Sequence, residues 1–169
     1  MFEPFLGPTV PFDIAATIIE AKPNGQGGYA GDMIHQSCAP ASVVAYGPGC
    51  GGITPLAIET DDSPMLGQTM AIRYPSIPQG STPAAFLMGH SQALLSLGGS
   101  TPGCVLLTSA EYVLLTPALL GGVYADFHIG ADPVLIGAPL TLQGVALAPG
   151  ANPLGVILSN GLAMTLGEF

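Results

Sequence analysis

Positive charge is almost absent from this sequence. The only basic residues are Lys22 and Arg73, against eleven acidic residues, and the net charge is −9. Nucleic acids and anionic membrane surfaces bind proteins through clusters of lysine and arginine, so we predict that neither is a partner. Charged residues make up only 8% of the chain, whereas about a quarter is usual. Contacts with another chain would therefore rely on apolar area and backbone hydrogen bonds.

Long apolar stretches are also missing. A helix that spans a membrane needs roughly twenty consecutive apolar residues, and Gly or Pro interrupts every candidate, including 105–120. We predict no membrane span. Residues 1–5 lack the positively charged region and the long apolar region of a secretory signal. We expect that such a signal has been removed and that the protein is secreted.

Turn-forming residues are abundant instead. The 24 Gly and 17 Pro among 169 residues disfavour helix interiors. Short strand-like segments recur between them, which is typical of a sandwich or barrel and not of alternating strands and helices. The length fits one compact domain with an extension. We predict an all-β fold, an antiparallel β-sandwich of jelly-roll or Ig-like topology with an N-terminal strand extension.

Alternating apolar and polar residues predict two half-buried strands, 66–74 and 123–129. Their inward residues are Leu66, Met70, Ile72 and Tyr74 in the first and Val123, Ala125, Phe127 and Ile129 in the second. Further strands are predicted at 53–58, 84–88, 104–108, 139–148, 155–158 and 162–166. Asn160-Gly161 separates the last two and is a strong turn signal, so we predict a C-terminal hairpin.

The first 45 residues are predicted to form an extension that precedes a sandwich domain over 46–169. Residues 9–21 are apolar and β-branched, as in a strand, and the Gly-rich segment 22–28 is typical of a linker. Such a strand either folds back onto its own sheet or completes the sheet of a neighbouring copy. The residues predicted to make this assembly contact are Val10, Phe12, Ile14, Ile18 and Ile19.

From Tyr46 to Gly167 the spacing of motifs resembles the C-terminal β-rich domain of large secreted and cell-surface proteins of planctomycete-type bacteria. The segments that carry the resemblance are 46–52 (YGPGCGG), 54–55 (TP), 84–91 (AAFLMGHS), 102–107 (PGCVLL), 131–137 (ADPVLIG) and 148–163 (APGANPLGVILSNGLA). The resemblance implies an extracellular antiparallel β domain without assigned catalytic activity, usually attached to a larger protein. Here only a short strand-bearing segment precedes it, and we expect the domain itself to be an assembling subunit.

Three cysteines, Cys38, Cys50 and Cys104, lack the paired spacing and histidine partners of a zinc site. In an exported Gly-rich domain, two of the three are expected to form a disulfide. The resemblance implies the pair Cys50–Cys104, because both lie in its Gly-Cys motifs. The alternatives are a Cys38–Cys50 bridge and three free thiols. With Cys50 and Cys104 paired, Cys38 is the odd thiol, either free or bonded to another chain.

The segment 89–93 (GHSQA) resembles the nucleophile turn of lipase-type hydrolases, and Asp126 and His128 follow Ser91 in the matching order. That turn requires a helix after the serine, and residues 93–99 are too short and Gly-terminated to form one. Asp126 and His128 also share one strand face, two residues apart, which does not suit separate triad members. We predict that the protein is not an enzyme.

The acidic segment 59–63 is a weak calcium candidate through Glu59, Asp61 and Asp62, because calcium binds carboxylate oxygens in loops. It lacks the spacing of an EF-hand, so a solvated turn is the favoured interpretation, and we predict no cofactor. Taken together, these features predict a self-assembling subunit of an extracellular filament or surface layer, that is, a homo-oligomer or homopolymer. The alternative is a secreted adhesion module that binds a glycan or another protein, although the chain contains no Trp for sugar stacking.

Overall fold

The computed structural model describes residues 17–24, 28–34, 39–51, 56–74, 77, 84–98, 103–116 and 122–169. The chain divides into two compact units, Met1–Cys38 and Ala39–Phe169. The strands are β1 (Thr17–Asn24), β2 (Gly28–Ile34), β3 (Ser42–Tyr46), β4 (Thr69–Tyr74), β5 (Ala84–Gly89), β6 (Gln92–Ser96), β7 (Val105–Thr108), β8 (Tyr112–Thr116), β9 (Val123–His128), β10 (Pro139–Leu147) and β11 (Val156–Thr165). Apart from a 3-10 turn at Pro133–Leu135, all regular structure in the described residues is strand. The all-β prediction is confirmed.

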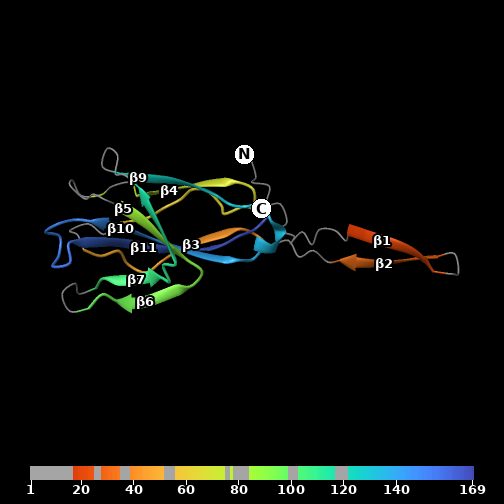
Figure 1. Cartoon of the computed structure of the whole chain (residues 1–169), viewed down its shortest axis with the longest axis horizontal. Coiled ribbons are helices and arrows are strands. Elements are labelled where there is room, and N and C mark those ends of the chain that lie inside the picture. The colour runs from red at the N-terminus through yellow and green to blue at the C-terminus, as the bar shows by residue number, and fades with distance from the viewer. Residues whose placement is uncertain are drawn as a thin grey trace, which may run out of the picture. The chain divides into compact units, whose positions relative to one another are not determined.

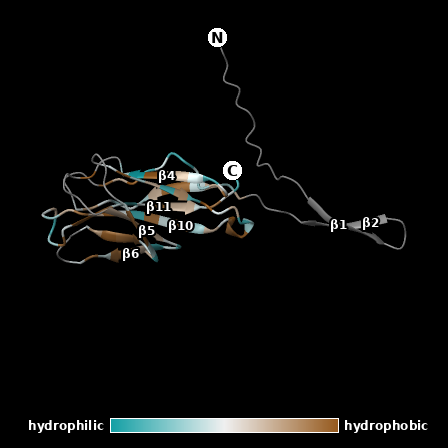
Figure 2. Ribbon diagram, turned by 45° about the horizontal axis from the view of Figure 1, so that its top comes forward, coloured by the Kyte–Doolittle hydropathy of each residue, from teal (hydrophilic) through white to brown (hydrophobic). Residues whose placement is uncertain are grey.

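The larger unit is built around a five-stranded sheet with the order β3-β11-β10-β5-β8. Every neighbouring pair in this sheet is antiparallel. Figure 1 shows the pair β4–β9 on one side of the sheet and the pair β6–β7 on the other. Hydrophobic segments, brown in Figure 2, occur in strands of all three layers. The arrangement is sandwich-like, with an additional two-stranded layer on the second face.

The main core lies between the central sheet and the β4–β9 pair. The aromatic ring of Phe86 on β5 contacts Tyr74 on β4 and Phe127 on β9, with ring centroids 4.7 and 5.7 Å apart. Offset and edge-to-face pairs of this kind add to the stabilisation that burial provides. The other large side chains that are fully buried in this core are Met70, Ile72, Val123, Leu142 and Ile157. The alternation predicted for 66–74 and 123–129 therefore places the expected faces inward.

Gln143 on β10 attaches β7 to the opposite face of the sheet. Its side-chain oxygen accepts from the N–H of Leu107 at 2.9 Å, and its amide nitrogen donates to the carbonyls of Val105 at 3.0 Å and Ser159 at 2.9 Å. Beside it, the disulfide of Cys50 and Cys104 packs against Leu158 and Val145. A polar group and a covalent bond thus hold a layer that has only a small apolar core.

The predicted strands at 84–88, 104–108 and 139–148 are confirmed as β5, β7 and β10, with shifts of one residue at their ends. The predicted C-terminal hairpin is wrong, because β11 runs through Asn160-Gly161 as one strand with a bulge opposite β10. Asn160 is held by a distant partner: its Oδ1 accepts from the N–H of Ile58 at 2.8 Å. Gly161 lies under the ring of Tyr46, where a Cβ has no room. Two tertiary contacts therefore override the local turn preference.

The prediction of a linker at 22–28 is also wrong. Lys22, Pro23 and Asn24 belong to β1, and Gly28 begins β2, which pairs with β1 in antiparallel register. The N-terminal unit thus contains a two-stranded sheet. The predicted boundary after residue 45 lies instead at residue 38, because β3 pairs with β11 and so belongs to the larger unit.

Candidate assembly surface

The strand β8 lies at one end of the central sheet. Within the described ranges it pairs on one side only, with β5, through five consecutive residue pairs from Ala84↔Thr116 to Met88↔Tyr112. An edge strand of this kind presents unpaired N–H and C=O groups that accept a further strand. The register has no shift along the whole strand. Its outer edge is therefore a regular template for strand addition.

The side chains of β8 are apolar and exposed. Tyr112, Val113, Leu114 and Leu115 are 56%, 59%, 39% and 72% exposed. Natural edge strands are usually protected from pairing by a charged side chain, a proline or a bulge. The sequence of β8, Tyr-Val-Leu-Leu-Thr, contains no charged residue and no proline. Within the residues that the structure describes, β8 therefore lacks a charge, a proline or a bulge that would protect its edge.

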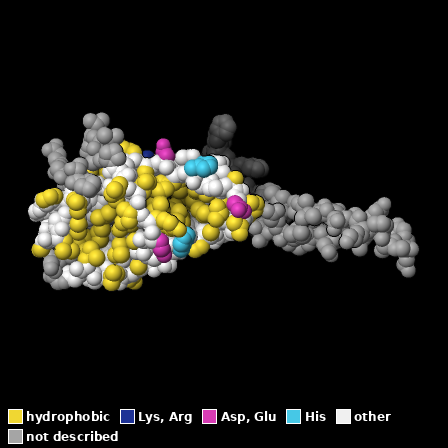
Figure 3. Space-filling view, viewed as in Figure 1, with side chains coloured by type: hydrophobic (Ala, Val, Ile, Leu, Met, Phe, Trp, Pro, Cys, Tyr) yellow, Lys and Arg dark blue, Asp and Glu magenta, His cyan; other side chains and the backbone are white. Residues whose placement is uncertain are grey.

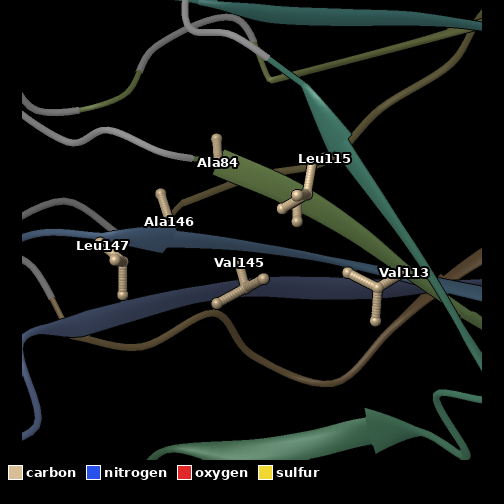
Figure 4. Close-up of a pocket in the computed structure, with 7 residues that line it drawn as sticks. Ala84, Val113, Leu115, Val145, Ala146 and Leu147 are labelled. Atoms are coloured by element: carbon tan, nitrogen blue, oxygen red, sulfur yellow. The ribbon is translucent and has the colours of Figure 1, made fainter.

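A shallow groove runs alongside β8. It has a volume of about 250 Å³ and is lined by Ala84, Ala85, Val113, Leu115, Val145, Ala146 and Leu147. Figure 4 shows Val113 and Leu115 on one side of it and the β10 residues Val145 and Leu147 on the other. Pockets for small molecules are larger and carry a few polar groups that orient the ligand. A wholly apolar lining of this size suits the side chains of a protein strand better.

The apolar surface extends beyond the groove. Figure 3 shows hydrophobic side chains, in yellow, gathered over much of the visible face of the larger unit, with few acidic or histidine side chains among them. On β6, Leu94 and Leu95 are 85% and 59% exposed. Contiguous exposed apolar patches on soluble proteins commonly mark interaction sites. The β8 edge, its groove and this surrounding face together form the candidate assembly surface.

The turn before β8 is fixed by a small polar cluster. The hydroxyl of Ser109 donates to Glu111 Oε2 at 2.7 Å, and the N–H of His90 donates to the same oxygen at 3.3 Å. The hydrogen bond from Ser109 is the main cause that lowers the pKa of Glu111. Ala110 between them has φ of 55°, a left-handed conformation that costs energy for a residue with a side chain. The cluster therefore holds a strained turn and sets where β8 begins.

The hydrolase-like residues do not lie together on one element. Ser91 lies between β5 and β6, and its N–H donates to Ser109 Oγ at 3.2 Å while its carbonyl accepts from Thr141 Oγ1 at 3.1 Å. Asp126 and His128 lie on β9, in a different sheet. β6 follows Ser91 where the lipase-type turn has a helix. The segment 89–93 is thus the connection between two strands.

The acidic segment 59–62 is engaged by β4. Asp61 forms an ion pair with Arg73 at 2.6 Å, and Glu59 lies 3.9 Å from the same guanidinium nitrogen. The carboxylate of Asp62 accepts from the N–H of Ala71 at 2.7 Å. In the part of the chain that the structure describes, no group of three His, Cys, Asp or Glu side chains is placed to hold a metal. The acidic side chains of this segment thus bind Arg73 and the backbone of β4.

The disulfide pairing implied by the resemblance is present. Cys50 and Cys104 are bonded, with their Cα atoms 5.1 Å apart and a sequence separation of 54. Cys38 lies outside the described residues. Among the residues predicted to make the assembly contact, Ile18 and Ile19 belong to β1, and Val10, Phe12 and Ile14 lie outside the described residues.

Comparison with protein-family models, curated proteins and solved structures found no match to the chain. The resemblance to the planctomycete-type domain therefore stays a prediction. No described helix is long and apolar enough to cross a membrane.

Proposed function

We propose that this protein is a self-assembling subunit of an extracellular homopolymer, such as a filament or surface layer. The observation that carries the proposal is the β8 edge, which combines an unbulged backbone template with four exposed apolar side chains. Adding a strand there satisfies backbone groups and removes apolar area from water at the same time. Few other surfaces of a soluble domain offer both gains.

A homopolymer requires two contact surfaces on each copy, because a single self-complementary surface stops at a dimer. The N-terminal unit supplies the second contact in this proposal. Its β1–β2 pair is a two-stranded sheet, and such a sheet is marginally stable in water without a packing partner. Residues 9–21, which include part of β1, remain the segment that we propose as the connection to a neighbouring copy.

The proposed extracellular location is supported by the Cys50–Cys104 disulfide. Disulfides form and persist mainly in oxidising compartments outside the cytosol. A surface with few charges also suits a protein that packs into an assembly, since little charge needs to be desolvated on contact. Charged residues are 8% of this chain.

Sedimentation velocity at increasing protein concentration tests the proposal. The wild-type protein is expected to form large species, and Leu115→Lys is expected to stop at small oligomers, because it places a charge in the apolar edge. Val134→Lys is the matched control, since Val134 is 78% exposed and lies on the 3-10 turn. It is expected to assemble like the wild type. A wild-type protein that stays monomeric at every concentration would refute the proposal.

A further inference from the structure

We infer that β8 pairs with β8 of a second copy in antiparallel register, about a two-fold axis through Leu114. This inference rests on the proposed function and names the partner of the β8 edge. The two-fold register places Leu114 opposite its own equivalent, Val113 opposite Leu115, and Tyr112 opposite Thr116. Two five-stranded sheets would then join into one continuous sheet across the pair of copies.

The side-chain chemistry of β8 is suited to this self-pairing. Leu115 and Val113 point to the same face of the sheet, because strand residues two apart share a face. Both line the groove. In the antiparallel register, Val113 of each copy lies beside Leu115 of the other, and apolar cross-strand pairs of this kind are favourable. The grooves of the two copies therefore become one apolar strip with no polar residue of β8 inside it.

The charges near β8 favour the antiparallel register over a parallel one. Glu111 is the acidic residue next to β8, and its pKa is lowered, so it is charged at neutral pH. Antiparallel pairing about Leu114 places the two copies of Glu111 at opposite ends of the strand pair, about 20 Å apart at 3.4 Å per residue. That distance exceeds the screening length of about 8 Å at physiological salt. Parallel pairing in register would put the two carboxylates side by side.

The opposite edge of the sheet is a poorer partner for β8. On β3, Val44 is the single large apolar side chain with high exposure, and Ser42 and Ala45 supply most of the remaining exposed positions. Pairing β8 with β3 of another copy would thus bring fewer exposed apolar side chains together than pairing β8 with itself. Self-pairing matches apolar residues with apolar residues, and it closes as a two-fold dimer, the commonest symmetry of homo-oligomers.

Cysteine crosslinking tests the register in full-length protein that carries Cys38→Ser, which removes the one cysteine outside the native disulfide. Leu114→Cys is expected to give a covalent dimer with a short bismaleimide crosslinker. Tyr112→Cys alone is expected to give none, since the two copies of residue 112 would be about 14 Å apart along the strands. Mixing Tyr112→Cys with Thr116→Cys is expected to restore the dimer. Val134→Cys, exposed but outside the β8 edge, is the control for random collision.

The outcomes separate this inference from the proposed function. A dimer from Leu114→Cys together with one from the mixed pair supports the two-fold register. Crosslinking of Tyr112→Cys with itself would show a parallel register and overturn the inference. Large assemblies without crosslinking at any β8 position would overturn it while leaving the homopolymer intact. A protein that neither crosslinks nor assembles would refute both. Circular dichroism of each variant establishes that it is folded before it is scored.

Discussion

Replacing Gln143 by leucine will loosen the outer β6–β7 layer. The side chain of Gln143 is fully buried and makes three hydrogen bonds to backbone groups of β7 and β11. Leucine is close to glutamine in size but offers no donor or acceptor. The N–H of Leu107 and the carbonyls of Val105 and Ser159 would each lose this partner in the interior.

The expected loss follows from the number of groups left unpaired. A buried donor or acceptor without a partner costs about 1–3 kcal/mol. Three such groups, offset by the added apolar burial of leucine, lower the free energy of unfolding by about 3–6 kcal/mol. That is a large share of the roughly 5–15 kcal/mol that holds a typical domain folded. The disulfide still ties β7 to the sheet, so we expect a weakened domain that remains oxidised.

Urea denaturation followed by circular dichroism measures this loss, and hydrogen exchange at the Leu107 amide localises it. Gln92→Leu is the matched control, because Gln92 is an exposed glutamine on β6. Exposed substitutions usually change stability by at most about 0.5 kcal/mol. A loss below about 1 kcal/mol for Gln143→Leu would contradict the reasoning, since it would mean that the three backbone groups find other partners.

Three further changes have expected outcomes. Replacing Cys50 and Cys104 together by alanine opens a loop with a separation of 54 residues and lowers the urea-derived stability by about 4 kcal/mol in the chain-entropy treatment; an unchanged midpoint would refute this. Gly144→Ala drives a methyl group into the ring of Tyr74 and lowers the melting temperature, equivalent to about 1–3 kcal/mol of overpacking. Gly130→Ala is the matched control, because Gly130 is exposed and an added methyl group there would make only an ordinary contact with Leu135; an equal loss in both variants would contradict the overpacking. Ser109→Ala raises the pKa of Glu111 in an NMR carboxyl titration, because it removes the main hydrogen bond that lowers it. Because the pKa of Glu111 is lowered in the folded protein, its ionised carboxylate stabilises the fold at a pH above the ordinary pKa of Glu. That stabilisation is lost as the pH falls through the lowered value.

Strand alternation predicted the β4–β9 layer well, because Met70, Ile72 and Val123 face a single apolar core. The hairpin predicted at Asn160-Gly161 failed because Asn160 bonds to Ile58, which lies 102 positions away in the sequence. Turn preferences consider only neighbouring residues and cannot include such a partner. Pro23 and the neighbouring glycines suggested a linker. In a two-stranded sheet each strand is an edge, where proline is tolerated.

The β8 edge was the most important feature that sequence reasoning missed. Residues 112–116 lie inside the apolar run 105–120, and apolar runs are ordinarily expected in the interior. The signal that could have separated β8 from β7 is the polar interruption Ser109-Ala-Glu111, which forms the turn between them. The exposure of β8, however, depends on which strand lies at the edge of the central sheet. Strand order is a property of the whole topology, and the five residues of β8 do not determine it.

The ion pair of Arg73 with Asp61 has a consequence for encounters between copies. Arg73 is the only basic residue in 39–169, and its charge is already matched by a neighbour on its own surface. Two approaching copies therefore meet as bodies of like sign, which repel at long range and attract only when apolar surfaces touch. Added salt shortens the reach of that repulsion. In the proposed assembly, ionic strength would thus mainly change the rate of association between copies. The affinity of the contact would come from the uncharged β8 edge.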